Sequence, residues 1–215
     1  MEHERELREF MLSSVHGLGL AIKETQVQQF MRYLSHLIEW NKIINLTAIT
    51  DPREIIIKHF IDSLVALVAT SFPQNGVVLD VGSGGGFPGI PLKIVRSDLR
   101  VILVEPVQKK CSFLNSTIGL LKLPDISTFS GTIEQYAKQP IRHAIEMIVI
   151  RALKYEEVRK HIPALLTSKG KVALFRTEVI KKQEIGEDFH IVNETTASLP
   201  HGHGTRVVTV LEINR

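Results

Sequence analysis

The sequence predicts an α/β protein, in which a doubly wound parallel sheet of about seven strands follows a helical segment. Apolar residues recur at helical spacing through residues 1–70. From residue 76, short β-branched runs alternate with helical or loop segments, which is typical of a sheet covered by helices. The first of these runs leads into a glycine-rich turn. We therefore expect two domains, a helical subdomain at 1–70 packed on a sheet domain at 71–215.

Two helices are predicted in the N-terminal segment before residue 41. Apolar residues spaced three and four apart cover 7–18 and 27–38. Thr25 and Gln28 fit the pattern of a capping box at the start of the second helix. Residues 41–51 are rich in Asn and Thr, and they are predicted to form a loop.

A third helix is predicted from residue 52 to about Thr70. The run Asp51–Glu54 offers an N-cap aspartate, a proline at the first helical position and a capping-box glutamate. His59 and Asp62 lie one turn apart on this helix. They hydrogen-bond to each other, line a crevice or belong to the helix core, and the sequence does not choose among these roles.

Seven β-branched runs are predicted to be the strands of the sheet. They are Val77–Val81, Val101–Glu105, Ile126–Ser130, Met147–Ile150, Val172–Phe175, Phe189–Val192 and Val207–Leu211. The first five are separated by segments long enough for helical crossovers, which predicts parallel pairing. Little besides Pro200 and glycines separates the last two, so we expect an antiparallel hairpin at the sheet edge.

Composition excludes several classes of protein. With 44% hydrophobic and 23% charged residues among 215, the chain is neither disordered nor fibrous. Its one cysteine, Cys111, excludes an intramolecular disulfide and any multi-cysteine metal site. The charged start and the lack of a long apolar run predict a cytoplasmic protein without a signal peptide or membrane span. The net charge of +3, with its basic excess in the C-terminal two-thirds, is compatible with a polyanionic partner.

A glycine-rich loop is the most specific feature of the sequence. Five glycines fall within the eight residues 82–89, directly after a buried strand. Missing side chains there let a ligand approach the backbone closely. Gly84, Gly86 and Gly89 fit the dinucleotide fingerprint, but this triplet begins late, and prolines remove two of the amides that a pyrophosphate needs.

A second interpretation starts the motif at Asp80, which ends the strand before Gly82, Gly84 and Gly86. An acid at this place repels a pyrophosphate but attracts the ammonium group of S-adenosylmethionine. Glu105 ends the second strand, where a carboxylate accepts both ribose hydroxyls of either cofactor. The pattern therefore favours S-adenosylmethionine over NAD(P), and a tight turn without a ligand is a third interpretation.

The segment after the third strand, Gly131–Glu134, is predicted to lie on the adenine side of the crevice. The Ile133 amide and the Glu134 carboxylate are candidate contacts to the adenine edge. Thr132 also fits the N-cap of a helix with Glu134 in its first turn, and both roles are compatible.

Several motifs together resemble one known family. They are Trp40-Asn41-Lys42, Asn45-Leu46-Thr47, His59-x-x-Asp62-Ser63-Leu64, Asp80-Val81-Gly82-Ser83-Gly84, Pro88-Gly89-Ile90-Pro91-Leu92, Lys109-Lys110, Phe113-Leu114, Arg151-Ala152 and Gly204-Thr205-Arg206. The chain resembles the bacterial guanine-N7 methyltransferases of small-subunit (16S) ribosomal RNA, also called glucose-inhibited division protein B. Two departures are Ile150, where many members have serine, and Thr205, where we expect an acid.

The resemblance implies a Rossmann-like class I methyltransferase sheet, S-adenosylmethionine as cofactor, and 16S ribosomal RNA or a small-subunit precursor as partner. It implies cofactor contacts at Gly82, Phe87, Glu105, Ile133, Glu134 and Arg151. Guanine N7 carries a free lone pair, so the reaction needs positioning rather than a strong base. A catalytic nucleophile is therefore not expected, and Cys111 is interpreted as a packing residue.

Cations are the remaining candidates for contact with the substrate. Arg151 and Arg206 are predicted to be catalytic, and Lys109 and Lys110 to bind RNA. No metal is expected, because the histidines of the run 201–204 lack other obvious ligands. The alternatives are an NAD(P)-dependent oxidoreductase and a non-catalytic RNA-binding protein that has kept the fold.

Overall fold

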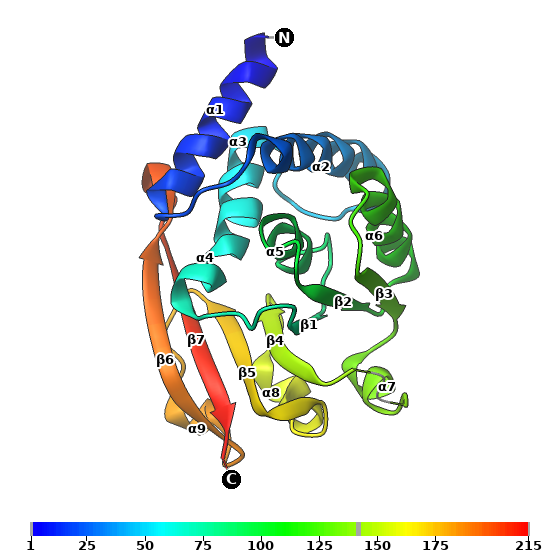
Figure 1. Ribbon diagram of the computed structural model, residues 1–215, viewed down its shortest axis with the longest axis vertical. Coiled ribbons are helices and arrows are strands. Elements are labelled where there is room, and N and C mark those ends of the chain that lie inside the picture. The colour runs from blue at the N-terminus through cyan, green and yellow to red at the C-terminus, as the bar shows by residue number, and fades with distance from the viewer. Residues whose placement is uncertain (1, 141–142, 215) are drawn as a thin grey trace.

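The computed structural model describes residues 2–140 and 143–214. Seven strands within these residues form one sheet, in the order β3-β2-β1-β4-β5-β7-β6 (Figure 1). The strands are β1 Val77–Val81, β2 Arg100–Glu105, β3 Ile126–Ser130, β4 Ile145–Arg151, β5 Leu166–Arg176, β6 Phe189–Ser198 and β7 Thr205–Ile213. Strands β1 to β5 pair in parallel, and β7 pairs antiparallel to both β5 and β6. The predicted fold class and the edge hairpin are confirmed.

Helices cover both faces of the sheet (Figure 1). On one face lie α1 Glu2–Gly17, α2 Glu24–Ile44, α3 Pro52–Ile55, α4 Asp62–Ala69, α5 Gly89–Val95 and α6 Gln108–Leu121. On the other lie α7 Ile133–Ala137, α8 Tyr155–Val158 and α9 Lys182–Ile185. Short 3-10 turns follow α8 at Arg159–His161 and join β6 to β7 at Pro200–Gly202. Among the described residues, no helix is both long and apolar enough to cross a membrane.

The three strands at the antiparallel end are longer than predicted, β5 and β6 most of all. The β6 strand continues to Ser198 rather than Val192, and β5 begins at Leu166 rather than Val172. The added part of β6 is mostly exposed and polar, so hydrophobicity gives no signal for it. This part is a strand because it pairs with β7, as far as Ser198 opposite Thr205.

The second helix differs from the prediction at both ends. It begins at Glu24, and the side chain of Gln26 accepts a hydrogen bond from the Lys23 amide at 2.7 Å, so the predicted capping box at Thr25 is wrong by two residues. The helix also continues through Ile44, into the predicted loop. Apolar side chains at this end pack on the main core, and they keep the chain helical.

The third helix begins as predicted, because the Asp51 carboxylate accepts a hydrogen bond from the Glu54 amide at 2.9 Å. It runs from α3 to α4 through a π-helical turn at Ile56–Ile61. In this turn the Asp62 amide donates to Ile57 O and His59 O rather than to Lys58 O, the α-helical acceptor. The turn therefore changes which side chains and carbonyls face the sheet.

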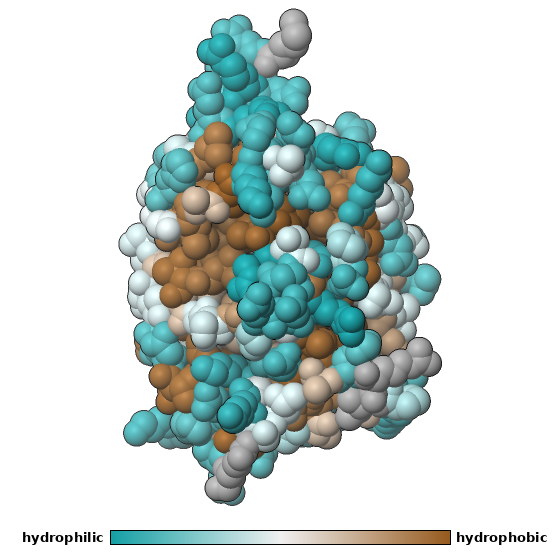
Figure 2. Space-filling model, in the orientation of Figure 1, coloured by the Kyte–Doolittle hydropathy of each residue, from teal (hydrophilic) through white to brown (hydrophobic). Residues whose placement is uncertain are grey.

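The surface of the helical layer is not uniform. Figure 2 shows polar side chains covering the projecting α1, and hydrophobic residues gathered in the half of this face where Figure 1 places α2 and α4. Val68 of α4 is a large hydrophobic side chain that is 47% exposed.

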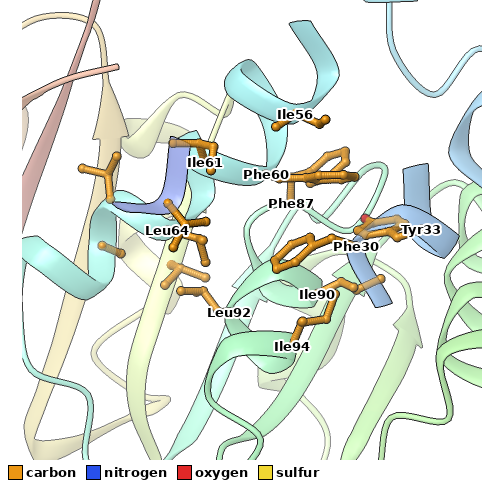
Figure 3. Close-up of a cluster of buried hydrophobic side chains, with 14 of the residues drawn as sticks. Phe30, Tyr33, Ile56, Phe60, Ile61, Leu64, Phe87, Ile90, Leu92 and Ile94 are labelled. Atoms are coloured by element: carbon orange, nitrogen blue, oxygen red, sulfur yellow. The ribbon is translucent and has the colours of Figure 1, made fainter. Parts of the chain in front are cut away.

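A buried aromatic cluster joins the helices to the glycine loop. Figure 3 shows Phe30 and Tyr33 of α2 beside Phe60 of the π-helical turn and Phe87 of the loop. The ring centroids of Tyr33 and Phe87 lie 5.5 Å apart. Hydrophobic burial of four rings holds the N-terminal segment against the sheet. The same packing fixes the loop where the candidate site begins.

Candidate functional site

A cavity of about 550 Å³ opens at the carboxyl ends of β1, β2 and β4, the edge at which open α/β sheets bind ligands. Of the predicted site residues, its walls include Gly82, Gly84, Phe87, Glu105, Lys110, Ile133 and Arg151. The structure therefore brings together residues from four segments that lie far apart in the sequence.

The glycine loop is tied to β2 at its start. The amides of Gly82 and Ser83 both donate to Val104 O, at 2.8 and 3.1 Å. Gly84 follows with a φ of +58°, a conformation that favours glycine. A Cβ built on Gly84 would meet only Gly82 O, at 3.9 Å, so this part of the backbone is open to a ligand in the cavity.

Glu105 is held in place by backbone amides. It is only 4% exposed, and its carboxylate oxygens accept hydrogen bonds from Gly84 N at 2.8 Å and Val107 N at 2.9 Å. Each oxygen of an ionised carboxylate has a second lone pair available. The side chain can therefore accept hydrogen bonds from a pair of ligand hydroxyls without reorganising.

Asp80 lies beneath the loop and does not line the cavity. Its side chain is fully buried, with Oδ2 accepting from Gly89 N at 2.8 Å at the start of α5. Its Oδ1 has no hydrogen-bond partner among the described residues. Burial raises the pKa of Asp80 to about 7, against the smaller lowering effects of the Gly89 amide and Arg151.

The dinucleotide interpretation finds no support in this loop. Gly86 does not line the cavity, and a Cβ there would lie 2.7 Å from the Tyr33 hydroxyl. The Gly89 amide is already used by Asp80. Gly86 and Gly89, two of the three glycines of the fingerprint, therefore pack against the interior of the protein and are not available to a ligand.

Thr132 caps α7, as one interpretation of the sequence predicted. Its hydroxyl accepts from Gln135 N at 3.2 Å, and the Gln135 side chain accepts from Thr132 N at 2.8 Å. Ile133 lines the cavity. Glu134 does not: its exposed carboxylate accepts from Lys138 Nζ at 2.9 Å, and this pairing lowers its pKa.

Both predicted catalytic arginines bind one buried aspartate. Arg151, at the end of β4, donates from Nη1 to Asp62 Oδ2 at 2.7 Å and to Lys58 O at 3.0 Å. Arg206, at the start of β7, donates from Nε to Asp62 Oδ1 and from Nη2 to Oδ2 at 2.9 Å. Asp62 is 0% exposed. One carboxylate thus joins two strands and the N-terminal helical segment.

His59 lies against the same cluster, and its role follows from its partners. The imidazole stacks on Phe87 at 4.6 Å, with Nδ1 3.2 Å from Arg151 Nη2 and Nε2 2.7 Å from Thr47 Oγ1. A guanidinium only donates, so Nδ1 accepts and Nε2 carries the hydrogen. Burial, and next Arg151, lower the pKa of His59 to about 3. The ring is neutral and lines the cavity, and both nitrogens are occupied.

A second cavity of about 980 Å³ adjoins the first. Four residues line both: His59, Arg151, Ala152 and Leu153. Arg206 lines only the second, with Lys154 and Arg176 among the other walls. A Cβ on Gly82 would lie 2.3 Å from Leu153 Cδ1, so Leu153 lies directly over the loop. Two ligands can therefore lie side by side, with Arg151 at their boundary.

The remaining candidates fall outside the cavities or at their rim. Lys110 is half-buried on the first cavity wall, and Lys109 is exposed. Cys111 is buried, with Sγ 3.1 Å from Glu105 O, as a packing residue would be. His201 stacks on Phe10 at 4.5 Å. Within residues 2–140 and 143–214, no group of three or more His, Cys, Asp or Glu side chains has metal-binding geometry.

Comparison with known proteins decides the family. The family model described as GidB, rRNA small subunit methyltransferase G, matches residues 26–204. The chain belongs to this family. A ribosomal RNA small subunit methyltransferase G of Staphylococcus epidermidis is 33% identical over 96% of this chain and 90% of that protein. One of Lachnoclostridium phytofermentans is 41% identical over 143 residues, which span 66% of this chain and 59% of that relative.

Solved structures confirm the class I methyltransferase fold at much lower identity. The protein MtNAS, solved with MTA and tNA, aligns with a TM-score of 0.62 and 14% identity over 98% of this chain and 87% of that chain. TrmN from Thermus thermophilus aligns with a TM-score of 0.58 and 17% identity over 72% and 48%. At these identities the likeness concerns the fold alone.

Two residues of the candidate site were missed by sequence reasoning. Asp62 was predicted to bond to His59, to line a crevice or to belong to the helix core, and its binding of both arginines was not foreseen. Tyr33 was treated only as part of a helix, yet its buried hydroxyl donates to Gly85 O and fixes the glycine loop. The only sequence signal for Tyr33 is a polar-tipped ring within the apolar face of a helix.

Proposed function

We propose that this protein transfers a methyl group from S-adenosylmethionine to N7 of a guanine in small-subunit (16S) ribosomal RNA. Membership of a ribosomal RNA methyltransferase family supports the reaction class. The observation that carries the proposal is the pair of adjoining cavities, with Arg151 shared. One is built from the glycine loop and Glu105, and the other has a mixed lining in which Lys and Arg side chains outnumber Glu.

The first cavity fits the cofactor. The open backbone at Gly84 admits the methionine part, Glu105 accepts the ribose hydroxyls, and Ile133 packs on the adenine. The bound cofactor supplies a methyl carbon made electrophilic by its sulfonium. With the cofactor bound, this carbon would pass to the N7 lone pair, and the carbon–sulfur bonding pair would stay on sulfur. The side chains of the chain hold the two reactants in line.

The chemistry of the second cavity suits an unassisted nucleophile. N7 has no proton to lose, so no general base is needed. His59 is neutral with both nitrogens occupied, and Cys111 is buried away from the cavity. The positive charge moves from sulfur to the base, so Arg151 and Arg206 act by orienting the guanine through O6 or a flanking phosphate.

Ribosomal RNA or a precursor of the small subunit is the proposed partner, and the cytoplasm is the proposed location of the protein. Lys109 and Lys110 start α6 beside the first cavity, and they are the proposed contacts to RNA phosphates.

The test combines binding and mapping. Small-subunit RNA and particles from cells lacking the protein are incubated with it and labelled S-adenosylmethionine, and modified guanines are mapped by mass. One new N7-methylguanine is expected, together with a thermal shift on adding S-adenosylhomocysteine but not NAD(P). RNA binding without methyl transfer would instead identify a non-catalytic RNA-binding protein.

A further inference from the structure

One side chain of the helical layer supports both cations of the proposed site. Asp62 follows the π-helical turn at the start of α4, and its two oxygens bind arginines that lie 89 and 144 residues further along the chain. The arginine side chains are 13% and 17% exposed, and the carboxylate is 0% exposed. The cluster is thus largely shielded from water. Charge interactions are stronger in such a protein interior than they are in water.

The charges of the cluster do not cancel. One carboxylate faces two guanidinium groups, which leaves a net charge of +1 on these three side chains, beside the second cavity. The Nη1 group of Arg206 donates to no acceptor among the described residues. Arg206 therefore presents free, fixed donors to whatever occupies that cavity, and among the described residues its only ion pair is with Asp62.

Stability alone does not account for this arrangement. A buried ion cluster is a weak source of stability, because the cost of desolvating the charges offsets their attraction, and apolar residues of similar volume often replace such clusters without loss. The π-helical turn is a further sign of specialisation, since such turns are rare and occur frequently at functional sites. Lys58 O, which the turn leaves without its α-helical donor, accepts from Arg151 instead.

We propose that Asp62 is a positioning residue that sets the distance and orientation between Arg151 and Arg206. It holds Arg151 at the boundary of the two cavities and Arg206 inside the second, so that both engage the target nucleotide together. The inference rests on the proposed function, because the nucleotide is the ligand that the two arginines orient. Asp62 itself touches neither substrate nor cofactor.

The experiment measures turnover with saturating S-adenosylmethionine and saturating RNA in Asp62→Asn, Arg206→Ala and the double variant. Asparagine keeps the shape of the side chain and removes its charge. Asp62→Asn should lower kcat roughly tenfold or more while S-adenosylhomocysteine still binds. In the Arg206→Ala background, Asp62→Asn should lower kcat by a clearly smaller factor, because one of the two arginines that Asp62 binds is already gone.

Asp98→Asn is the matched control. Asp98 pairs with Arg96 at 2.7 Å, and neither residue lines the two cavities. Losing that pair should lower the melting temperature and leave kcat unchanged. If Asp62→Asn does not fold, Arg206→Lys takes its place, since it keeps the charge but loses the two-pronged hydrogen bond to Asp62. It should also lower kcat roughly tenfold.

Two results would overturn the inference. One is a wild-type kcat in folded Asp62→Asn or in Arg206→Lys. The other is a fall in kcat on Asp62→Asn that is the same whether residue 206 is arginine or alanine. If the wild-type protein itself transfers no methyl group to guanine N7, the proposed function fails instead. Activity of the wild type therefore separates the two failures.

Discussion

Glu105 and Gly84 are joined by a 2.8 Å hydrogen bond from the loop amide to Oε2 of the carboxylate. This bond connects the last residue of β2 to the most open point of the glycine loop, so one side chain both shapes the loop and faces the cavity. The two functions predict a large effect on cofactor affinity when the carboxylate is removed.

Glu105→Ala should cost about 1.5–3 kcal/mol of S-adenosylhomocysteine affinity, the range for hydrogen bonds to a charged group. Calorimetry on the folded variant measures this loss. Glu134→Ala is the control, because Glu134 is exposed and bound to Lys138, and it should bind with wild-type affinity. Wild-type affinity in Glu105→Ala would remove Glu105 from the site.

Lys109→Ala and Lys110→Ala should raise the apparent Michaelis constant for RNA without lowering the maximal rate. Each lost phosphate contact should flatten the salt dependence of binding by about one unit of slope. Binding and turnover at two salt concentrations test this. Lys169→Ala is the control, since Lys169 lies near the amino end of β5 and away from both cavities. A salt slope equal to that of the wild type would exclude the two lysines from the RNA interface.

Cys111→Ala should keep most of the methyl transfer rate, because the thiol is buried and faces Glu105 O rather than the cavity. No covalent complex with RNA should appear on a denaturing gel. A folded but inactive variant, or an adduct in the wild type, would point to attack by the thiol on a pyrimidine.

Asp80 should make stability depend on pH. Burial raises its pKa from 3.8 to about 7, so the folded protein holds this proton more tightly than the unfolded chain does. The resulting stability is complete below pH 3.8 and is lost as the pH rises through 7. Asp80→Asn cannot ionise, so its free energy of unfolding relative to wild type should rise from pH 5 to pH 8 in urea titrations.

For Asp98 the sign is opposite, because the pKa of its carboxyl is lowered by hydrogen bonds from Arg96. That group stays ionised in both states over the same pH range. The difference between Asp98→Asn and wild type should therefore be the same at pH 5 and pH 8. An Asp80→Asn difference that is equally flat would mean that the buried carboxyl does not titrate there.

Elements with local signals were predictable from the sequence. Strand β1 was predicted with the bounds that the structure has, since an apolar run between turn residues marks a buried parallel strand. The bounds of β3 were also predicted, although none of its residues is buried, because it combines apolar and β-branched residues with serines. The exposed half of β6 was not predictable, because its pairing with β7 rather than its own hydrophobicity makes it a strand. Local patterns report burial and turns, but they do not report the partner of an exposed edge.

The candidate site likewise contains residues that the sequence could place and contacts that it could not. Glu105 could be placed on the cavity because the end of a parallel strand has a fixed position next to its neighbour. The pairing of Asp62 with Arg206 spans 144 residues, and it depends on how a helix lies across two strands. Spacing along the chain holds no information on such a contact.

The placement of Asp62 has a consequence for how this chain can be recombined. The carboxylate precedes the junction between α4 and β1, and both arginines follow it. A chimera joined at that junction inherits the anion from one parent and the two cations from the other. A crossover at the junction of the helical segment and the sheet therefore separates Asp62 from Arg151 and Arg206. If the two parents differ at these three positions, the chimera would bury charges that do not match.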